Sequence, residues 1–310
     1  MTFLGLDVGG THCRWEWWPA GVLPGGDARG VQPAVHGIEA STAALAEVLE
    51  SATRTAKPTA AVCALAGVGD LRTSQAITTG LRARAVGFPV AVVGDVIAAA
   101  AAGLADGPGV LLWSGTGSFA VARTANDELC RVGGRGYLLG DQGSGYDFVR
   151  RAAAAVLLAA DELGPATALT EALTSVFAAA SPQRLGAILQ QMDPGQVAAK
   201  LSVVLEVAAG GDAVANEVLE AGADALAGLA TAAVRKAGLD WRSLPAALGG
   251  GVVLGAPHVT TLLTERLQAL GSATPTIADA RAAARGAAWL AHGWHDRLPP
   301  RYTWVERVAI

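Results

Sequence analysis

Near its start the chain reads Phe3-Leu4-Gly5-Leu6-Asp7-Val8-Gly9-Gly10-Thr11, an apolar run that ends in a carboxylate and a turn of small residues. Such a run predicts a buried strand, and the alternating character of Cys13–Trp18 predicts a second strand after the turn. The plan returns at Val110-Leu111-Leu112-Trp113-Ser114-Gly115-Thr116-Gly117-Ser118, followed by an expected strand over 119–123. The alternative is a chance likeness of two glycine turns. We favour two related domains, each opening on such a hairpin.

The rest of the chain alternates strands and helices before residue 125 and is mostly helical after it. The pattern predicts a loop over 21–37, helices over 41–56 (N-capped by Ser41), 74–86, 96–104, 259–270 and 281–292, strands over 59–65, 89–93 and 246–248, and an Ala-rich helical region over 146–238. A length of 310 residues suggests two domains. We expect an α/β fold with a small domain, residues 1–108 plus about 283–310, and a larger domain, residues 109–282, that carries a helical insertion.

Composition disfavours several classes of protein. The chain has 23 Lys and Arg against 27 Asp and Glu, a net charge of −4, which argues against nucleic acid or an anionic membrane as the main partner. We expect no membrane span, because charged residues interrupt the apolar stretches. The three cysteines, Cys13, Cys63 and Cys130, are widely spaced and form no disulfide or metal-binding pattern, which favours a cytoplasmic protein.

The two glycine turns are candidates for phosphate binding, because successive main-chain N–H groups in such a turn can bind phosphate oxygens without lysine. Few cations lie near the turns, so Mg²⁺ must neutralise the phosphates, and Asp7 is placed to hold it through water. A plain hairpin turn is the alternative for each. The expected phosphate-binding residues are Gly9, Gly10 and Thr11 in the first turn and Thr116, Gly117 and Ser118 in the second, with the Thr11 and Ser118 hydroxyls as additional donors.

Two other nucleotide-binding signatures do not fit this sequence. A P-loop needs Gly-Lys-Ser/Thr, and none of the three lysines, Lys57, Lys200 and Lys236, stands in that setting. Residues 115–120 match the letters of the dinucleotide fingerprint. That motif requires a helix after the turn, whereas a strand is predicted here, so we interpret the match as a decoy.

Two further carboxylates are candidates for chemistry. Asp95 follows an apolar strand and precedes an Ala-rich helix, so it is either a helix N-cap or a general base at the carboxyl end of a strand. Asp141 lies in the glycine-rich stretch 132–146, where it could accept hydrogen bonds from sugar hydroxyls. The alternative for that stretch is a flexible surface loop. Ser144 is expected to cap the helix that follows.

Taken in order, these motifs resemble the N-acetylglucosamine kinases of the BadF/BadG-type branch of the sugar kinase, Hsp70 and actin superfamily. The resemblance rests on Leu6–Thr11, Gly94–Val96, Ser114–Ser118, Gly133–Tyr146 and Gly249–Val252, and it spans residues 3 to about 290. It implies two ribonuclease H-like, actin-like ATPase domains flanking a nucleotide and sugar cleft. It also implies that Gly250 and Gly251 lie in the adenosine loop, that Asp95 is the catalytic base, that Asp141 contacts sugar, and that the last helix returns to the N-terminal domain.

The sequence departs from the family pattern around the expected sugar site. Gly94 replaces an Asn or Thr, Gln142 replaces a Glu, and Arg135 replaces the Trp of a Gly-Gly-Trp-Gly motif that also contains Gly134. The family's N-terminal sugar-contacting Asn has no clear match, and Gln32 is the nearest candidate. Gly67 is a further candidate for the sugar site, because the stretch Ala66-Gly67-Val68 lies where some members of the family carry a Ser.

The resemblance predicts an ATP- and Mg²⁺-dependent kinase that phosphorylates the 6-hydroxyl of an amino sugar, N-acetylglucosamine first. Glucosamine and N-acetylmuramic acid are the alternatives, because Arg135 would repel an ammonium and attract a lactyl carboxylate. A homodimer is common in the family. An ATPase that activates an iron–sulfur dehydratase is the alternative from a different class. It is disfavoured, because that branch needs paired cysteines to hold a cluster between subunits.

Overall fold

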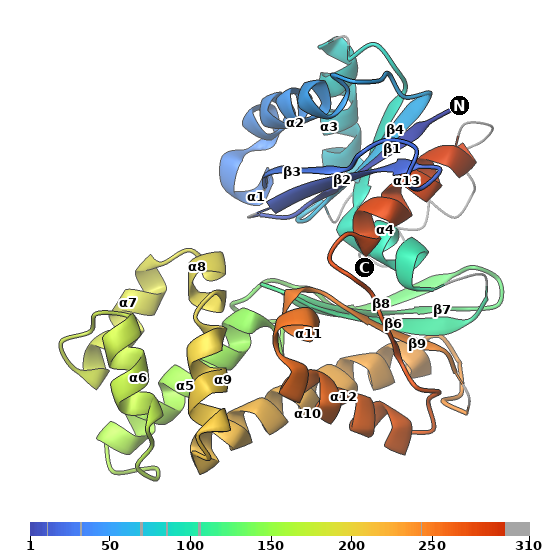
Figure 1. Cartoon of the computed structure of the whole chain (residues 1–310). Coiled ribbons are helices and arrows are strands. Elements are labelled where there is room, and N and C mark those ends of the chain that lie inside the picture. The colour runs from blue at the N-terminus through green and yellow to red at the C-terminus, as the bar shows by residue number, and fades with distance from the viewer. Residues whose placement is uncertain are drawn as a thin grey trace. The chain divides into compact units, whose positions relative to one another are not determined.

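The computed structural model describes residues 1–294 except 11, 32, 69–70, 85, 105–106 and 243. The chain divides into two compact units (Figure 1). The first unit comprises residues 1–111, 123–130 and 278–310, and the second comprises residues 112–122 and 131–277. Among the described residues, no helix is long and apolar enough to cross a membrane.

The first unit is built on a five-stranded sheet with the order β3-β2-β1-β4-β5. The central strand β1 pairs antiparallel with β2 and parallel with β4, which in turn pairs parallel with β5. The parallel strands are almost wholly apolar, as expected for strands covered on both faces. The strands are β1 (Phe3–Val8), β2 (His12–Trp18), β3 (Gly26–Arg29), β4 (Ala60–Leu65) and β5 (Val90–Gly94).

Helices cover both faces of this sheet (Figure 1). On one face, Leu4 and Leu6 of β1 share a core cluster with Leu45 of α2 and Ile77 of α3. On the other face, Phe3 of β1 packs with residues of α4 and α13. The helices of the unit are α1 (Pro33–His36), α2 (Ile38–Ala52), α3 (Leu71–Ala83), α4 (Asp95–Gly103) and α13 (Ala282–Trp294).

Small residues allow α13 to lie directly against the main chain of β1 and α4. A Cβ at Gly5 of β1 would lie 2.0 Å from the amide nitrogen of Ala288, and a Cβ at Gly286 would lie 2.1 Å from the carbonyl oxygen of Ala98. Side chains alternate along a strand, so Asp7 faces the same side as Gly5, which is the side that α13 and α4 cover. The packing of α4 and α13 against this face of the sheet therefore determines the surroundings of Asp7.

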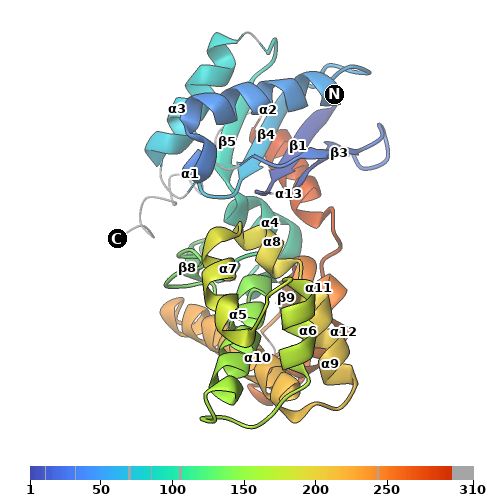
Figure 2. The same cartoon turned by 90° about the vertical axis from the view of Figure 1, so that its left-hand side faces the viewer.

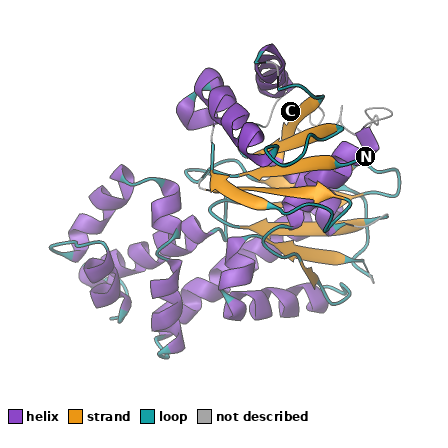
Figure 3. Ribbon diagram, turned by 45° about the horizontal axis from the view of Figure 1, so that its top comes forward, coloured by secondary structure: helices purple, strands orange, loops and turns teal. Residues whose placement is uncertain are grey.

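The second sheet has the order β10-β9-β6-β7-β8, which is the order of the first sheet read from its other edge. In both sheets the first two strands form a hairpin, and the third strand pairs with the second. The fourth strand pairs with the first, and the fifth pairs with the fourth. Figure 3 shows the strands of both sheets in orange. The strands are β6 (Gly109–Ser114), β7 (Ser118–Arg123), β8 (Leu129–Gly133), β9 (Ala246–Gly249) and β10 (Thr276–Ile277). The predicted α/β fold with a repeated hairpin is confirmed.

The helical region of the second unit lies between β8 and β9 in sequence. It forms one large apolar cluster that includes Phe148 and Leu169, both fully buried. Figure 2 shows α5, α6, α7, α8 and α9 grouped together, with α10 and α12 running beside one another. The helices of this region are α5 (Gly145–Ala160), α6 (Leu169–Val176), η1 (Pro182–Arg184), α7 (Leu185–Gln191), α8 (Pro194–Ala198), α9 (Leu201–Ala209) and α10 (Ala213–Lys236). Two further helices of the unit, α11 (Gly251–Gly255) and α12 (Pro257–Ala269), follow β9.

Two local predictions are wrong, one strand was missed, and one of the two alternatives for Asp95 is excluded. The expected loop over 21–37 contains β3 and α1, and β8 was not predicted. Helix α2 begins at Ile38 after Gly37, so Ser41 is a buried residue inside the helix and not its N-cap. Asp95 is likewise not an N-cap, because that position belongs to Gly94 and Asp95 is the first residue of α4.

Candidate active site

The first glycine turn is closed by its own main chain. The Gly9 N–H donates to the carbonyl of His12, and the Val31 N–H donates to the carbonyl of Gly9, both at 2.9 Å. Gly30 is pressed against the turn, since a Cβ there would lie 2.2 Å from the Gly9 carbonyl oxygen. Gly9 therefore shapes the turn and does not itself offer a free N–H, which corrects the expectation that it is a phosphate donor. Gly10 is exposed, and Thr11 lies outside the described residues.

Asp7 and Asp95 lie close enough to repel one another. Burial at the end of β1 and, to a smaller extent, the charge of Asp95 together raise the pKa of Asp7 from 3.8 to about 7, against the opposing effect of Arg14. Arg14 is opposite Asp7 in the β1–β2 register. The strand β5 ends one residue before Asp95, so both carboxylates stand at the carboxyl ends of parallel strands, where α/β proteins place their ligands.

Gly94, the residue before Asp95, packs closely against the main chain of Val68. A Cβ at Gly94 would lie 2.9 Å from the carbonyl oxygen of Val68, so the Asn or Thr of the family pattern does not fit without movement. Val68 follows Gly67, an exposed residue with φ of 79° in the turn after β4. The Asp95 Oδ1 accepts a hydrogen bond from the Val96 N–H at 2.9 Å. The departure at Gly94 therefore has a packing reason and leaves the carboxylate in place.

In the second unit, the turn Ser114–Ser118 is tied to the loop Asp141–Gly145 by side chains and main chain. The Ser114 hydroxyl donates to the Gly143 carbonyl and the Ser118 hydroxyl donates to the Gln142 carbonyl, both at 2.7 Å. The Gly145 N–H donates to the Gly115 carbonyl at 2.8 Å. The predicted phosphate turn and the predicted sugar loop are thus one hydrogen-bonded assembly.

This network corrects one expectation about Ser118. Its hydroxyl hydrogen is committed to Gln142, its carbonyl accepts from the Gly134 N–H at 2.8 Å, and the residue is only 1% exposed. The hydroxyl is therefore not available to a phosphate. Thr116 and Gly117 are more accessible and remain the phosphate-binding candidates of this turn.

Asp141 lies beside Gly117. A Cβ at Gly117 would lie 2.9 Å from Oδ2 of Asp141, so only glycine leaves room for the carboxylate there. Burial raises the pKa of Asp141, while main-chain hydrogen bonds from Ser118 and Gly136 and the charge of Arg131 act in the opposite direction. Asp141 also has φ of 55°, an uncommon conformation for a residue with a side chain. Its position is specified by the fold and not by local preference.

Gly250 joins the same assembly from β9. It has φ of 98°, and a Cβ there would lie 2.2 Å from the Ser114 carbonyl oxygen. Gly251, exposed at the start of α11, lies next to Gly115. The structure therefore brings together, within the second unit, the predicted adenosine glycines, the second turn and Asp141.

One departure from the family pattern, Arg135, lies on the loop that precedes Asp141. Gly134 has φ of 65°, and a Cβ there would meet the Arg131 guanidinium, which donates to the Gly134 carbonyl at 2.7 Å. Arg135 is exposed, as are Leu138 and Leu139. Gly134 therefore has a structural role, and Gln32 lies outside the described residues.

Sequence reasoning missed Asp147 as a part of this assembly. Asp147 is buried and accepts a hydrogen bond from the Gly143 N–H at 2.8 Å. Its position three residues after the predicted cap Ser144 was the available signal, since an acidic residue there often bonds to the main chain before the helix. The predicted cap is confirmed, because the Ser144 Oγ accepts from the Asp147 N–H at 3.2 Å.

Two of the three cysteines are unsuited to hold a cluster at a subunit interface. Cys13 and Cys63 are fully buried. Burial raises the pKa of the Cys13 thiol to about 12 and also raises that of Cys63, so both stay protonated. Among the described residues, no group of three or more His, Cys, Asp or Glu side chains could hold a metal ion.

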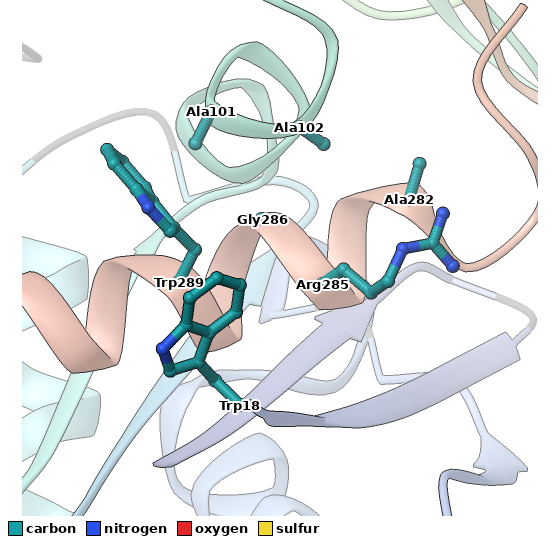
Figure 4. Close-up of a pocket in the computed structure, with 7 residues that line it drawn as sticks. All are labelled: Trp18, Ala101, Ala102, Ala282, Arg285, Gly286 and Trp289. Carbon is teal, nitrogen blue, oxygen red and sulfur yellow. The ribbon is translucent and has the colours of Figure 1, made fainter. Parts of the chain in front are cut away.

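A separate pocket in the first unit contains none of the predicted site residues. It lies where α4 and α13 meet the end of β2 (Figure 4). Its floor is made of small residues, and two indole rings and a guanidinium form the rest of its lining. The lining residues are Trp18, Ala101, Ala102, Ala282, Arg285, Gly286 and Trp289.

Comparisons with known proteins agree with the resemblance seen in the sequence. An N-acetyl-D-glucosamine kinase from Dictyostelium discoideum is 33% identical over 165 residues, which are 51% of this chain and 51% of that protein. An N-acetylmuramic acid/N-acetylglucosamine kinase from Clostridium acetobutylicum is 38% identical over 88 residues, or 28% of this chain and 29% of that protein. The matches thus span about half or less of these curated relatives.

A solved structure extends the likeness of fold to almost the whole chain. A candidate N-acetylglucosamine kinase from Chromobacterium violaceum superposes with a TM-score of 0.72 at 24% identity, covering 93% of this chain and 98% of that one. The model of the BadF/BadG/BcrA/BcrD ATPase family matches residues 4–291. The chain therefore belongs to the BadF/BadG/BcrA/BcrD ATPase family, as its motifs predict.

Proposed function

We propose that this protein is an ATP-dependent kinase that phosphorylates the 6-hydroxyl of an amino sugar, most readily N-acetylglucosamine. Membership of an ATPase family and the names of the two curated relatives support this proposal. We also propose that the two compact units correspond to the domains expected at residues 1–108 with about 283–310 and at 109–282.

The observation that carries the proposal is the pair Asp7 and Asp95. Two carboxylates that repel one another at the carboxyl ends of β1 and β5, the two strands that flank β4, are costly for folding, and chemistry explains their presence. Asp95 would accept the proton of the sugar hydroxyl as it attacks. A general base of this kind typically contributes about 10²–10⁴-fold to the rate.

The donor set also fits a divalent cation. Asp7 is a hard oxygen ligand whose ionisation is disfavoured by burial and by Asp95, and a nearby Mg²⁺ would offset both. Asp7 would hold the ion through water, and the ion would supply neutralisation of the nucleotide phosphates. In the second unit, phosphate would bind the main chain of the turn at Thr116 and Gly117, with Gly250 and Gly251 beside the nucleoside. In the first unit, the main chain of Gly10 is the candidate for phosphate.

Asp141 would anchor two adjacent hydroxyls of the sugar ring. A buried carboxylate can accept from both, and a sugar that lacks one would leave an acceptor unpaired. This selects a hexose skeleton, while the relatives favour an N-acetyl group. Arg135 is exposed on the loop before Asp141, so N-acetylmuramic acid, which carries a carboxylate, is the second candidate and glucosamine the third.

The test is a coupled ADP-release assay on the purified protein with glucose, glucosamine, N-acetylglucosamine, N-acetylmuramic acid and no sugar. We expect the highest kcat/KM with N-acetylglucosamine. A preference for glucosamine would refute the ranking, and hydrolysis of ATP that ignores every sugar would refute the kinase proposal.

The burial of Cys13 and Cys63 argues against the alternative of a dehydratase activator. A cluster shared between two subunits needs cysteines that both subunits present at their surface. Iron and sulfide added to the reduced protein should therefore produce no cluster absorbance.

A further inference from the structure

Asp147 is a buried carboxylate that the proposed chemistry does not use. It is the third residue of α5, and its side chain is 6% exposed. Its Oδ2 accepts from the Gly143 N–H at 2.8 Å and from Arg151 at 2.7 Å, and its Oδ1 accepts from Arg150 at 2.6 Å. Burial alone would raise the pKa of Asp147, but these hydrogen bonds outweigh burial and lower it, so the group is ionised at neutral pH.

Gly143, the loop residue that donates its N–H to Asp147, is held by contacts at its N–H, its carbonyl and its Cα. The Gly143 N–H is bound by Asp147, and the Gly143 carbonyl is bound by the Ser114 hydroxyl at 2.7 Å. Gly143 has φ of 72°, and a Cβ there would lie 2.4 Å from the Leu226 side chain of α10. These contacts hold the orientation of the Gly143 peptide, and Asp147 supplies the charged one among them.

This fixed peptide lies two residues after Asp141. Between them, the Gln142 carbonyl accepts from the Ser118 hydroxyl, and the Ser144 N–H donates to the Asp141 carbonyl at 3.1 Å. Asp141 itself has a positive φ, so its main chain does not hold this conformation by local preference. If the Gly143 peptide were released, we therefore expect the position of the Asp141 carboxylate to change first.

We propose that Asp147 is a positioning residue for sugar binding: by anchoring the Gly143 N–H it holds the Asp141 loop in the orientation that accepts two ring hydroxyls. This role rests on the proposed function. The turn at Thr116 and Gly117 is held in addition by the strands β6 and β7 on either side, so it depends less on Asp147. The positioning role thus predicts that changes at Asp147 weaken sugar binding more than they weaken ATP binding.

The experiment compares Asp147→Ala and Asp147→Asn with a matched control at Asp212. Asp212 is the N-cap of α10 in the same unit, where its carboxylate accepts from the N–H groups of Ala215 and Ala168, both at 2.8 Å. Like Asp147, it ties a helix start to another segment. Asp212→Ala should lower the melting temperature and leave both Michaelis constants unchanged.

For Asp147→Ala we expect the KM for sugar to rise by about tenfold, the effect of losing one charged hydrogen bond, with the KM for ATP changed less than twofold. Asp147→Asn keeps an acceptor for the Gly143 N–H, so its KM for sugar should lie between those of Asp147→Ala and the wild type. If Asp147→Ala does not fold, Asp147→Asn and Arg151→Gln carry the test, each with a smaller rise in the KM for sugar.

Equal changes in both Michaelis constants, or an unchanged KM for sugar in a folded variant, would overturn the positioning role while leaving the kinase proposal intact. Absence of sugar-dependent turnover in the wild type would instead refute the proposed function, and the positioning role with it.

Discussion

Replacing Asp7 by Asn should make the protein more stable at alkaline pH while removing its Mg²⁺-dependent nucleotide binding. The asparagine keeps the shape of the side chain and cannot ionise. A pKa of about 7 instead of 3.8 means that ionising Asp7 in the folded state costs about 4 kcal/mol more than in the unfolded state. That figure is the upper limit of the gain from the substitution.

The direction of the pH dependence follows from the raised pKa of Asp7. Below about pH 4 the carboxyl is protonated in both the folded and the unfolded protein, so it costs nothing. Between about pH 4 and 7 the unfolded chain releases the proton while the folded protein keeps it, so the wild type loses stability as the pH rises. Above about pH 7 both states are ionised and the full cost remains.

Urea unfolding at about pH 5 and pH 9 measures this difference, because wild type and Asp7→Asn share every other titrating group. We expect the variant to gain stability relative to wild type between the two pH values. Asp240→Asn, at a carboxylate 72% exposed, is the control and should show no such gain. Saturating Mg²⁺ and ATP should stabilise the wild type alone. An Asp7→Asn variant that is less stable than wild type at about pH 9 would refute the reasoning.

Three further predictions concern the remaining site residues. Asp95→Asn should lower turnover by about 10²–10⁴-fold without lowering the melting temperature, because it removes a charge that repels Asp7, and wild-type turnover would contradict its role as base. Gly250→Ala places a Cβ 2.2 Å from the Ser114 carbonyl oxygen, so calorimetry should find weaker ATP binding by about tenfold or more, whereas Gly255→Ala, with open space around its Cβ, should bind normally. Arg135→Ala should raise the KM for N-acetylmuramic acid by about fivefold and spare N-acetylglucosamine; equal changes for both sugars would contradict a contact with the carboxylate.

The hairpins and their turns were predictable because their signals are local. An apolar run followed by small residues specifies strand and turn within a few positions, and the repetition of that pattern anticipated two sheets of the same strand order. The family followed from the order of the motifs and is confirmed over residues 4–291.

The elements missed by sequence reasoning are those that depend on a neighbour. Strand β3 reads Gly-Asp-Ala-Arg and has no apolar alternation, and it is a strand because Ala28 and Arg29 pair with Cys13 and His12 of β2. Ser41 resembles a cap by type. The helix had already begun at Ile38, which leaves Ser41 buried inside it.

The properties of the site were also set by distant partners. Ser118 resembles a phosphate ligand in sequence, yet its hydroxyl bonds to a carbonyl 24 residues away, and the hydroxyl of Ser114 bonds to a carbonyl 29 residues away. The raised pKa of Asp7 depends on burial and on Asp95, which another strand brings near. Gly94 departs from the family pattern because of Val68, a contact that only the folded chain makes.

The central claim is that a phosphoryl group passes from ATP to the 6-hydroxyl of an amino sugar. Phosphorus-31 NMR of the wild-type protein incubated with Mg²⁺, ATP and N-acetylglucosamine tests it most directly. We expect a sugar phosphomonoester coupled to the two protons on carbon 6, formed in equal amount to ADP. Inorganic phosphate as the only product beside ADP, or a phosphate on another sugar carbon, would contradict the account.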